Sequence, residues 1–289
     1  MIISIASGKG GTGKTTVAVN LALSLENAQL LDCDVEEPNA HLFLNPVISE
    51  REKGYIPVPK IDQSKCNFCG KCAKICVYKA IAIIPVQGER KGSALIFEQL
   101  CHGCGACSAL CPQGAIKEVN RGIGIIESGS SGGLEFTHGK LNIGEAMSPP
   151  LIRKVKEHIN SEKTVIIDAP PGTSCPVVAS IKESDFCILV TEPTPFGLND
   201  LILAVEVLKK LAIPFGVVIN RADLGNDKTE KYCKKENIPV LMKIPFKKEI
   251  AAAYSKGEPI VKVFPEYKGI FQNLFNEICL LKNKKDNAN

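Results

Sequence analysis

A glycine-rich loop close to the first residue constrains the fold more than any other feature of the chain. Gly8, Gly13, Lys14 and Thr15 fit the pattern G-x-x-x-x-G-K-S/T, with a strand-like run before them and a helix-like segment after them. Glycines let backbone N–H groups turn toward phosphate oxygens, and the following helix offers its positive end to the same phosphates. Strand, loop and helix in this order predict a nucleotide phosphate site.

Apolar and amphipathic segments alternate over most of the chain. Helix-like segments separate four apolar runs, which are IISIAS, TVIIDAP, FCILVTEP and FGVVINRA. Continuous apolar strands between helices are typical of a parallel sheet covered on both faces. We therefore predict an α/β fold of the P-loop NTPase type, with a doubly wound, mostly parallel sheet.

Two cysteine-rich blocks interrupt this alternation. Residues 66–81 and 101–116 share the pattern C-x-x-C-G-x-C-x-x-x-C-x-x-x-A-I at an offset of 35 residues, which indicates a duplicated unit. The stretch between them, IAIIPVQGERKGSALIFEQL, favours a short hairpin with a polar, glycine-containing turn. The blocks hold eight of the thirteen cysteines, and such close spacing in a reducing compartment indicates metal binding.

The cysteine spacing is typical of bacterial ferredoxins with two 4Fe-4S clusters. Three cysteines on a tight loop reach three corners of one cluster, and the fourth points across to the other cluster. This predicts two crossed ligand sets, one of Cys66, Cys69, Cys72 and Cys111, and the other of Cys101, Cys104, Cys107 and Cys76. Zinc and disulfides are the alternatives, although zinc typically uses two C-x-x-C pairs and disulfides suit an oxidising compartment.

These patterns divide the chain into four segments. We predict the first part of a P-loop ATPase domain over 1–59, an inserted small α+β domain resembling a bacterial ferredoxin over 60–117, the second part of the ATPase domain over 118–282, and a flexible tail over 283–289.

The loop GKGGTGKTT carries a second lysine, Lys9, directly after its first glycine. With this loop the chain resembles the MinD/ParA family of deviant P-loop ATPases, which includes the nitrogenase iron protein and the Mrp-type cluster carriers. The resemblance implies that Lys9 crosses a dimer interface to the partner's nucleotide, where its charge assists phosphoryl transfer. The expected nucleotide-binding residues of the loop are Gly8, Lys9, Gly10, Gly11, Thr12, Gly13, Lys14, Thr15 and Thr16.

Individual residues of this loop and of two later segments have expected roles in binding and hydrolysing the nucleotide. Lys14 is expected to reach the β- and γ-phosphates, Thr15 to bind Mg²⁺, and Thr16 to lie near the α-phosphate. The segment LLDCDVEEPN resembles the family's first switch, which makes Asp34 the carboxylate that orients the attacking water. The segment VIIDAPPGT resembles the second switch.

The resemblance implies three further residues of the nucleotide site. Asp168 would hold Mg²⁺ through water, and the amide of Gly172 would sense the γ-phosphate. Asn220, in VINRA, matches a position that binds adenine, and the stretch KIPFKKEIAAAYSKGEPIV resembles the family's late segment beside the base.

Composition and charge limit the expected partners. The net charge of +4 is mild and evenly spread, so no nucleic-acid partner is expected. The sequence has no 18-residue apolar run and no signal-peptide-like start, and the apolar stripe of residues 270–281 favours a packing helix over a membrane-binding one. We expect a cytoplasmic protein without stable membrane association.

Together these features predict an ATP-hydrolysing iron–sulfur protein with ATP or ADP, Mg²⁺ and two 4Fe-4S clusters. It would act as a homodimer, or as a dimer with a close relative, that couples ATP turnover to electron transfer or to engagement of a redox or metal-cluster partner. A cluster assembly scaffold or carrier is one alternative, although Cys233 and Cys279 do not form the C-terminal C-x-x-C of Mrp-type carriers. A positioning or regulatory ATPase with a redox-sensing module is another.

Overall fold

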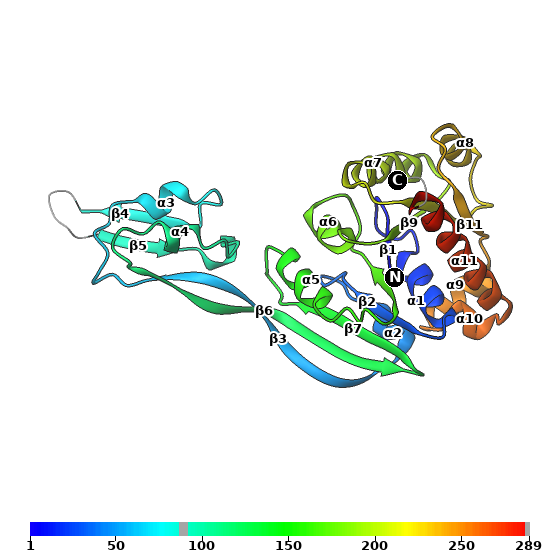
Figure 1. The fold of residues 1–289 in the computed structure, drawn as a ribbon, viewed down its shortest axis with the longest axis horizontal. Helices are drawn as coiled ribbons and strands as arrows, with labels where there is room; N and C mark the ends of the chain where they lie inside the picture. Colours follow the sequence, from blue (N-terminus) through cyan, green and yellow to red (C-terminus); the bar gives the residue numbers. More distant parts are fainter. Residues whose placement is uncertain (87–91, 287–289) are drawn as a thin grey trace. The chain divides into compact units, whose positions relative to one another are not determined.

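Strands and helices alternate along the chain (Figure 1). The computed structural model describes residues 1–86 and 92–286. Its strands are β1 (Ile2–Ala6), β2 (Ala28–Asp32), β3 (Val47–Ile61), β4 (Ile81–Pro85), β5 (Gly92–Ile96), β6 (Ile116–Ser131), β7 (Leu134–Leu141), β8 (Thr164–Asp168), β9 (Phe186–Thr191), β10 (Phe215–Asn220) and β11 (Val240–Ile244). Its helices are α1 (Lys14–Ser24), α2 (Ala40–Leu44), α3 (Lys71–Ile75), α4 (Ala106–Ala109), α5 (Pro149–Lys156), α6 (Cys175–Ile181), α7 (Pro195–Leu211), α8 (Lys228–Lys235), α9 (Lys248–Ser255), α10 (Ile260–Val263), α11 (Glu266–Asp286) and the short 3-10 helix η1 (Glu98–Leu100).

One sheet within the described residues has the order β11-β10-β9-β1-β8-β2-β7-β6-β3. The pairs from β11 to β7 are parallel, which confirms the predicted mostly parallel sheet. The register places Asp32 of β2 opposite Asp168 of β8, so that two carboxylates end neighbouring strands side by side.

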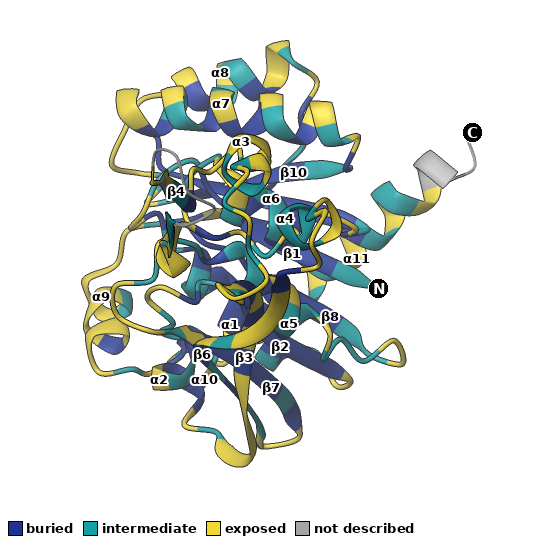
Figure 2. Cartoon of the chain, turned by 90° about the vertical axis from the view of Figure 1, so that its left-hand side faces the viewer, coloured by how far each residue is buried: buried dark blue, intermediate teal, exposed yellow. Residues whose placement is uncertain are grey.

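Apolar side chains fill both faces of this sheet. One cluster joins the sheet to α1, α10 and α11, with Phe136 and Phe271 fully buried in it, and the other joins the opposite face to α6, α7 and α8. Neighbouring residues Val217 and Val218 of β10 belong to different clusters because successive side chains of a strand point to opposite faces. Figure 2 shows the resulting buried strands beneath helices whose outer sides are exposed.

The structure divides into two compact units. Unit 1 comprises Met1–Glu52, Ile126–Lys140 and Ile152–Asn289, and unit 2 comprises Lys53–Ile125 and Leu141–Leu151. Unit 2 therefore extends beyond the predicted insert of 60–117, because β3 and β6 continue without a break through its boundaries. It contains the predicted hairpin as the antiparallel pair β4 and β5, whose expected turn falls at residues 87–91, outside the described residues.

The described residues of the expected flexible tail at 283–289 are helical. Helix α11 continues to Asp286, and just before the predicted tail Lys282 Nζ lies 2.7 Å from Asp185 Oδ1. Residues 287–289 lie outside the described residues.

Candidate functional site

The predicted nucleotide-site residues gather at the carboxyl ends of the parallel strands. Residues 8–13 connect β1 to α1, and Lys14, Thr15 and Thr16 form the first turn of that helix. Asp34 follows β2, Asp168 ends β8, Gly172 follows it, and Asn220 ends β10. Because carboxyl ends of parallel strands share one edge of a sheet, segments far apart in sequence meet there, as ligand sites of this architecture require.

Two glycines of the loop have positions that only glycine fits. A Cβ on Gly8 would collide with the carbonyl oxygen of Asp200, and a Cβ on Gly13 would lie 2.5 Å from Asn220 Nδ2. Gly13 also has φ +95°, in the left-handed region that favours glycine. Asn220 Nδ2 donates to the carbonyl oxygen of Thr12 over 2.9 Å, so the amide predicted to bind adenine holds the phosphate loop in this structure.

Three carboxylates and one lysine make up the charged centre. Lys14 is 7% exposed, and burial lowers its pKa while Asp168, Asp34 and Asp32 raise it. Burial raises the pKa of Asp34 to about 6, against the lowering effect of Lys14. Burial also raises the pKa of Asp32, and the neighbouring charge of Asp168 raises it further. The centre holds more negative than positive charge, which favours a bound cation.

Asp168 fits the expected Mg²⁺ site. The residue is 1% exposed, and neither carboxylate oxygen has a hydrogen-bond partner among the described residues. Burial raises its pKa, whereas the nearby Thr15 hydroxyl and Lys14 lower it. A buried carboxylate without partners is costly unless a cation or a proton compensates it. Thr15 and Asp168 therefore offer the hydroxyl and carboxylate oxygens that Mg²⁺ takes in proteins.

Asp32 has a structural role that the sequence analysis did not assign. Its Oδ1 accepts from the backbone N–H of Asp34 over 3.1 Å, and its Oδ2 accepts from the N–H groups of Asn39 and Ala40 at 3.0 Å each. These bonds fix the segment that carries Asp34 directly after β2.

Lys9 lies within an ion-paired group of its own chain. Its Nζ is 3.4 Å from Glu192 Oε2, and Arg221 pairs with Glu192 Oε1 at 2.8 Å. The Glu192 side chain is 9% exposed and that of Lys9 is 32% exposed. The expected crossing of Lys9 to a partner subunit would thus require it to leave Glu192. The sequence analysis missed Glu192 and Arg221, because an acid after β9 and an arginine after β10 carry no motif.

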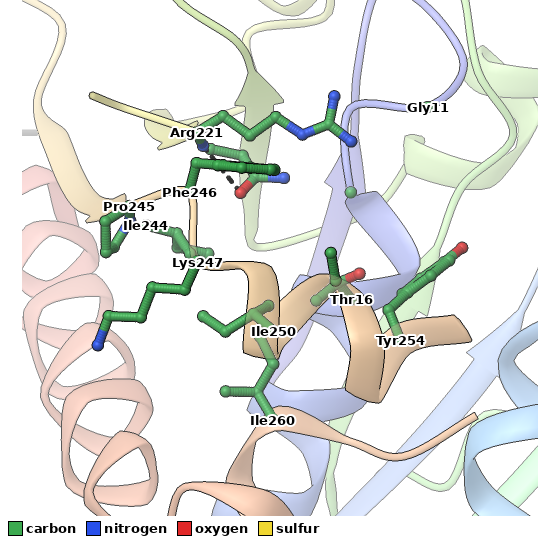
Figure 3. A pocket seen from close by; sticks show the side chains of 13 residues that line it. Gly11, Thr16, Arg221, Ile244, Pro245, Phe246, Lys247, Ile250, Tyr254 and Ile260 are labelled. Atoms are coloured by element: carbon green, nitrogen blue, oxygen red, sulfur yellow. Dashed lines mark hydrogen bonds between the residues drawn. The ribbon is translucent and has the colours of Figure 1, made fainter. Parts of the chain in front are cut away.

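A pocket of about 310 Å³ opens beside the loop (Figure 3). Thr16 and Arg221 border it, together with Phe246 and Tyr254 from the late segment that precedes and forms α9. Aliphatic side chains of Ile244, Ile250 and Ile260 complete much of the wall. An apolar cavity with aromatic rings, next to a phosphate loop, suits a nucleotide base and its sugar.

The predicted ligand sets correspond to two separate pockets in unit 2. One pocket is lined by Cys66, Cys69, Cys72 and Cys111, and the other by Cys101, Cys104, Cys107 and Cys76. The structure thus brings together the thiols of each crossed set. Burial raises the pKa of Cys72, and the nearby thiols Cys66 and Cys111 raise it further.

Backbone N–H groups point at four of these sulfurs. Phe68 donates to Cys66 Sγ and Gly103 to Cys101 Sγ over 3.4 Å, and Ala80 and Ala115 donate to Cys76 and Cys111 over 3.3 and 3.4 Å. Such bonds stabilise thiolates, which are the form that binds a cluster. Four thiols around one pocket, with N–H donors aimed at the sulfurs, fit a 4Fe-4S cluster.

Compact sites for a single metal ion are absent from the part of the chain that the structure describes, in which no three His, Cys, Asp or Glu side chains form such a group. A four-iron cluster is wider than one ion and holds its thiolates farther apart. No helix among residues 1–86 and 92–286 is long and apolar enough to cross a membrane.

Known proteins resemble the chain in sequence and in fold. It is 34% identical to an uncharacterised protein of Methanocaldococcus jannaschii over 91% of this chain and 92% of the relative. It is 26% identical to the iron-sulfur cluster carrier protein of Pyrococcus abyssi over 90% of this chain and 78% of the relative. Among solved structures, the septum site-determining protein MinD of Pyrococcus horikoshii, complexed with Mg-ADP, matches with a TM-score of 0.58 at 22% identity over 96% of this chain and 95% of MinD.

A family description also covers most of the chain. Residues 3–260 match the CobQ/CobB/MinD/ParA nucleotide binding domain. The match includes the phosphate loop, both switch-like segments and all but the last residue of the late segment beside the pocket, in the order that the sequence predicted. The chain therefore belongs to the CobQ/CobB/MinD/ParA family of nucleotide-binding domains.

Proposed function

We propose that this protein is an ATP-switched iron–sulfur protein that hands clusters from unit 2 to an acceptor protein. The observation that carries the proposal is the division of eight cysteines into two four-thiol pockets within a chain of this nucleotide-binding family. We rank cluster handover above electron transfer because two relatives, whose alignments cover 90% of this chain, are named iron-sulfur cluster carrier proteins.

The nucleotide chemistry is assigned to residues of unit 1. Lys14 and the loop amides bind the phosphates, Thr15 and Asp168 hold Mg²⁺, and Asp34 orients the water that attacks the γ-phosphate. Mg²⁺ supplies charge neutralisation of the phosphate oxygens when bound. Water and ATP give ADP, phosphate and a proton. ATP would close a dimer, for which Lys9 must exchange Glu192 for the partner's nucleotide.

The cargo chemistry is a ligand exchange. Thiolates of the acceptor replace thiolates of one four-cysteine set, and the cluster moves with its charge, so the step needs no oxidant or reductant. The nucleotide bound to unit 1 would determine when a four-cysteine set releases its cluster. This requires that the free energy of cluster binding differ between the ATP-bound and ADP-bound states.

Electron transfer is the second candidate. The observation in its favour is that each pocket already contains four thiols of the same chain, which complete the coordination of a cluster and favour keeping it in place. In this case, ATP would time the passage of an electron to the partner while both clusters stay bound.

A handover assay separates these functions. The protein is loaded with iron and sulfide under anaerobic conditions and mixed with the apo form of a small acidic bacterial ferredoxin, without nucleotide, with ADP and with ATP. We expect ATP to accelerate cluster handover at least about tenfold, and Lys14→Ala to abolish the acceleration because it removes the phosphate-binding cation. Lys268→Ala, at an exposed position of unit 1, is the matched control.

Handover at one rate in every nucleotide state would refute the proposal. If no cluster moves but the protein, with its clusters first reduced by dithionite, reduces the iron-loaded ferredoxin faster with ATP, electron transfer replaces handover as the function.

A further inference from the structure

Four lysines distinguish the first cysteine block from the second. Lys65, Lys71, Lys74 and Lys79 lie within 65–79, which contains no Asp or Glu. At the offset of 35 residues their counterparts are uncharged, namely Leu100, Ala106, Ala109 and Gly114. We call the four lysines the lysine surface.

The lysine surface is exposed, and its charges are largely uncompensated. All four side chains are exposed, and Lys71, Lys74 and Lys79 have no ion pair among the described residues. Lys65 has only a loose one, at 3.9 Å from Asp62. Lys71 and Lys74 lie three residues apart on the short helix α3 and so share one face of it.

The surface borders the first thiol set. Lys71 itself lines the pocket of Cys66, Cys69, Cys72 and Cys111. Among the residues that the structure describes, the only charged one that lines the second pocket is Glu118, whose Oε1 accepts from the Ser108 hydroxyl over 3.1 Å. Lys71 therefore adds positive charge at the first set, whereas Lys79 follows the turn of Cys76, which belongs to the second set.

Lys79 occupies a backbone position that suits glycine. Its φ is +55°, and its counterpart Gly114 has the same φ of +55°. Both follow the same turn, because their N–H groups donate to Cys76 and Cys111 carbonyl oxygens over 3.2 and 3.1 Å. A lysine in this region is strained, and within residues 1–86 and 92–286 its exposed side chain has no hydrogen bond or ion pair that compensates. Because no interaction within the described part of the chain offsets the backbone strain of Lys79, we infer that its charge binds a partner outside the chain.

The other strained residue of this block differs in this respect. Phe68 has φ +53°, and its counterpart is Gly103. Phe68 packs closely over Gly92, where a Cβ would lie 2.9 Å from its ring, and it lines the first pocket. Packing accounts for Phe68 and leaves Lys79 as the unexplained case.

We propose that the lysine surface docks an acidic protein that exchanges a cluster or an electron with the thiol sets to which this block contributes. The partner class rests on the proposed function. Exposed apolar side chains of Ile75, Val77 and Tyr78 lie among the lysines in sequence, and Val77 is 82% exposed. Charges around apolar side chains favour a protein surface over a phosphate backbone, which needs cations alone.

The test is binding to the same acidic ferredoxin, in iron-loaded form, at low and high salt. Lys71→Glu combined with Lys74→Glu should weaken binding about tenfold or more at low salt, and high salt should remove most of the difference. Lys79→Gly should weaken it about threefold without loss of the fold, because glycine suits the backbone there. Lys268→Glu should change binding little, and basic cytochrome c should bind weakly. The iron content of every variant is measured first.

Equal affinity of the lysine variants and Lys268→Glu would overturn the proposal. So would equal binding of cytochrome c, or stronger binding of duplex DNA than of ferredoxin. Failure of the proposed function is distinguishable. If the variants lose binding but no cluster or electron ever moves, the docking proposal is supported and the proposed function is refuted. If handover proceeds unchanged in the variants, the proposed function is supported and the docking proposal is refuted.

Discussion

The two cysteine blocks share a backbone and differ in charge. Left-handed positions recur at the 35-residue offset, with Phe68, Gly70 and Lys79 in the first block and Gly103, Gly105 and Gly114 in the second. Sulfur-directed N–H groups recur as well, at Phe68 and Gly103 and at Ala80 and Ala115.

The difference shows which features a thiol pocket requires. Positions that set the loop path are the same in backbone whatever the side chain, whereas the outward positions carry lysines in one block and none in the other. Thiol geometry thus constrains the backbone, and the surface charge is available for a different purpose in each block.

The largest expected effect tests the crossed pairing of the blocks. Cys69→Ala with Cys111→Ala disrupts one set and should leave about half of the iron and sulfide per chain. Cys69→Ala with Cys76→Ala changes two cysteines of one block but removes one ligand from each set, and should remove nearly all of the iron and sulfide. Iron and sulfide are counted after anaerobic reconstitution, and retained nucleotide binding shows that unit 1 is folded.

The opposite pattern would break the comparison. If Cys69→Ala with Cys76→Ala keeps half of the iron, each block holds its own cluster without crossing.

A smaller effect distinguishes two glycines of the second block. Gly114→Ala should destabilise the protein by about 1 kcal/mol, because φ is positive but no atom lies within 4 Å of the new Cβ. Gly103→Ala should cost about 1–2 kcal/mol more, because its Cβ would lie 3.0 Å from the Pro57 carbonyl oxygen. The guanidinium midpoint for loss of cluster absorbance measures both, and equal midpoints would contradict the crowding at Gly103.

The counterpart in the first block should behave in the opposite way. Lys79→Gly relieves about 1–2 kcal/mol of left-handed strain in the folded state. Glycine also stabilises the unfolded state by about 0.4–1 kcal/mol through its larger conformational entropy, so we expect the free energy of unfolding to rise by about 0.5–1 kcal/mol. The same midpoint, measured beside Lys79→Ala, tests this. A loss of stability in Lys79→Gly would mean that the lysine makes a stabilising contact.

The smallest effect concerns the reduction potentials. Exposed lysines near the first set stabilise its reduced, more negative form, so Lys71→Gln with Lys74→Gln should lower that potential by on the order of 10 mV at low salt. The second set should shift less. Redox titration followed by EPR measures both potentials, and equal shifts would show that the charge is not local to one block.

Motifs with strict local chemistry were predictable from sequence. The phosphate loop requires glycine at Gly8 and Gly13, and the cysteine spacing fixes which thiols can meet, so the structure brings these residues together as expected. The parallel sheet followed from apolar runs that are buried on both faces.

Long-range pairings were not predictable. Strand β3 carries Pro57 and Pro59, which argue against a strand in sequence, but it lies at the edge of the sheet where a missing N–H is tolerated. The Lys9, Glu192 and Arg221 group joins three separate loops, and the ion pair of Lys282 with Asp185 spans 97 residues. Such contacts depend on the folded arrangement and leave no local pattern.

Nucleotide control of the clusters is the central claim, and EPR of the reduced, iron-loaded protein tests it most directly. Spectra and potentials are recorded without nucleotide, with ADP and with a non-hydrolysable ATP analogue, in the wild type and in Asp168→Asn. The account predicts a change of spectrum or potential with the ATP analogue alone, and no change in Asp168→Asn, which lacks the carboxylate proposed to hold Mg²⁺. Identical spectra and potentials in all three nucleotide states of the wild type would contradict it.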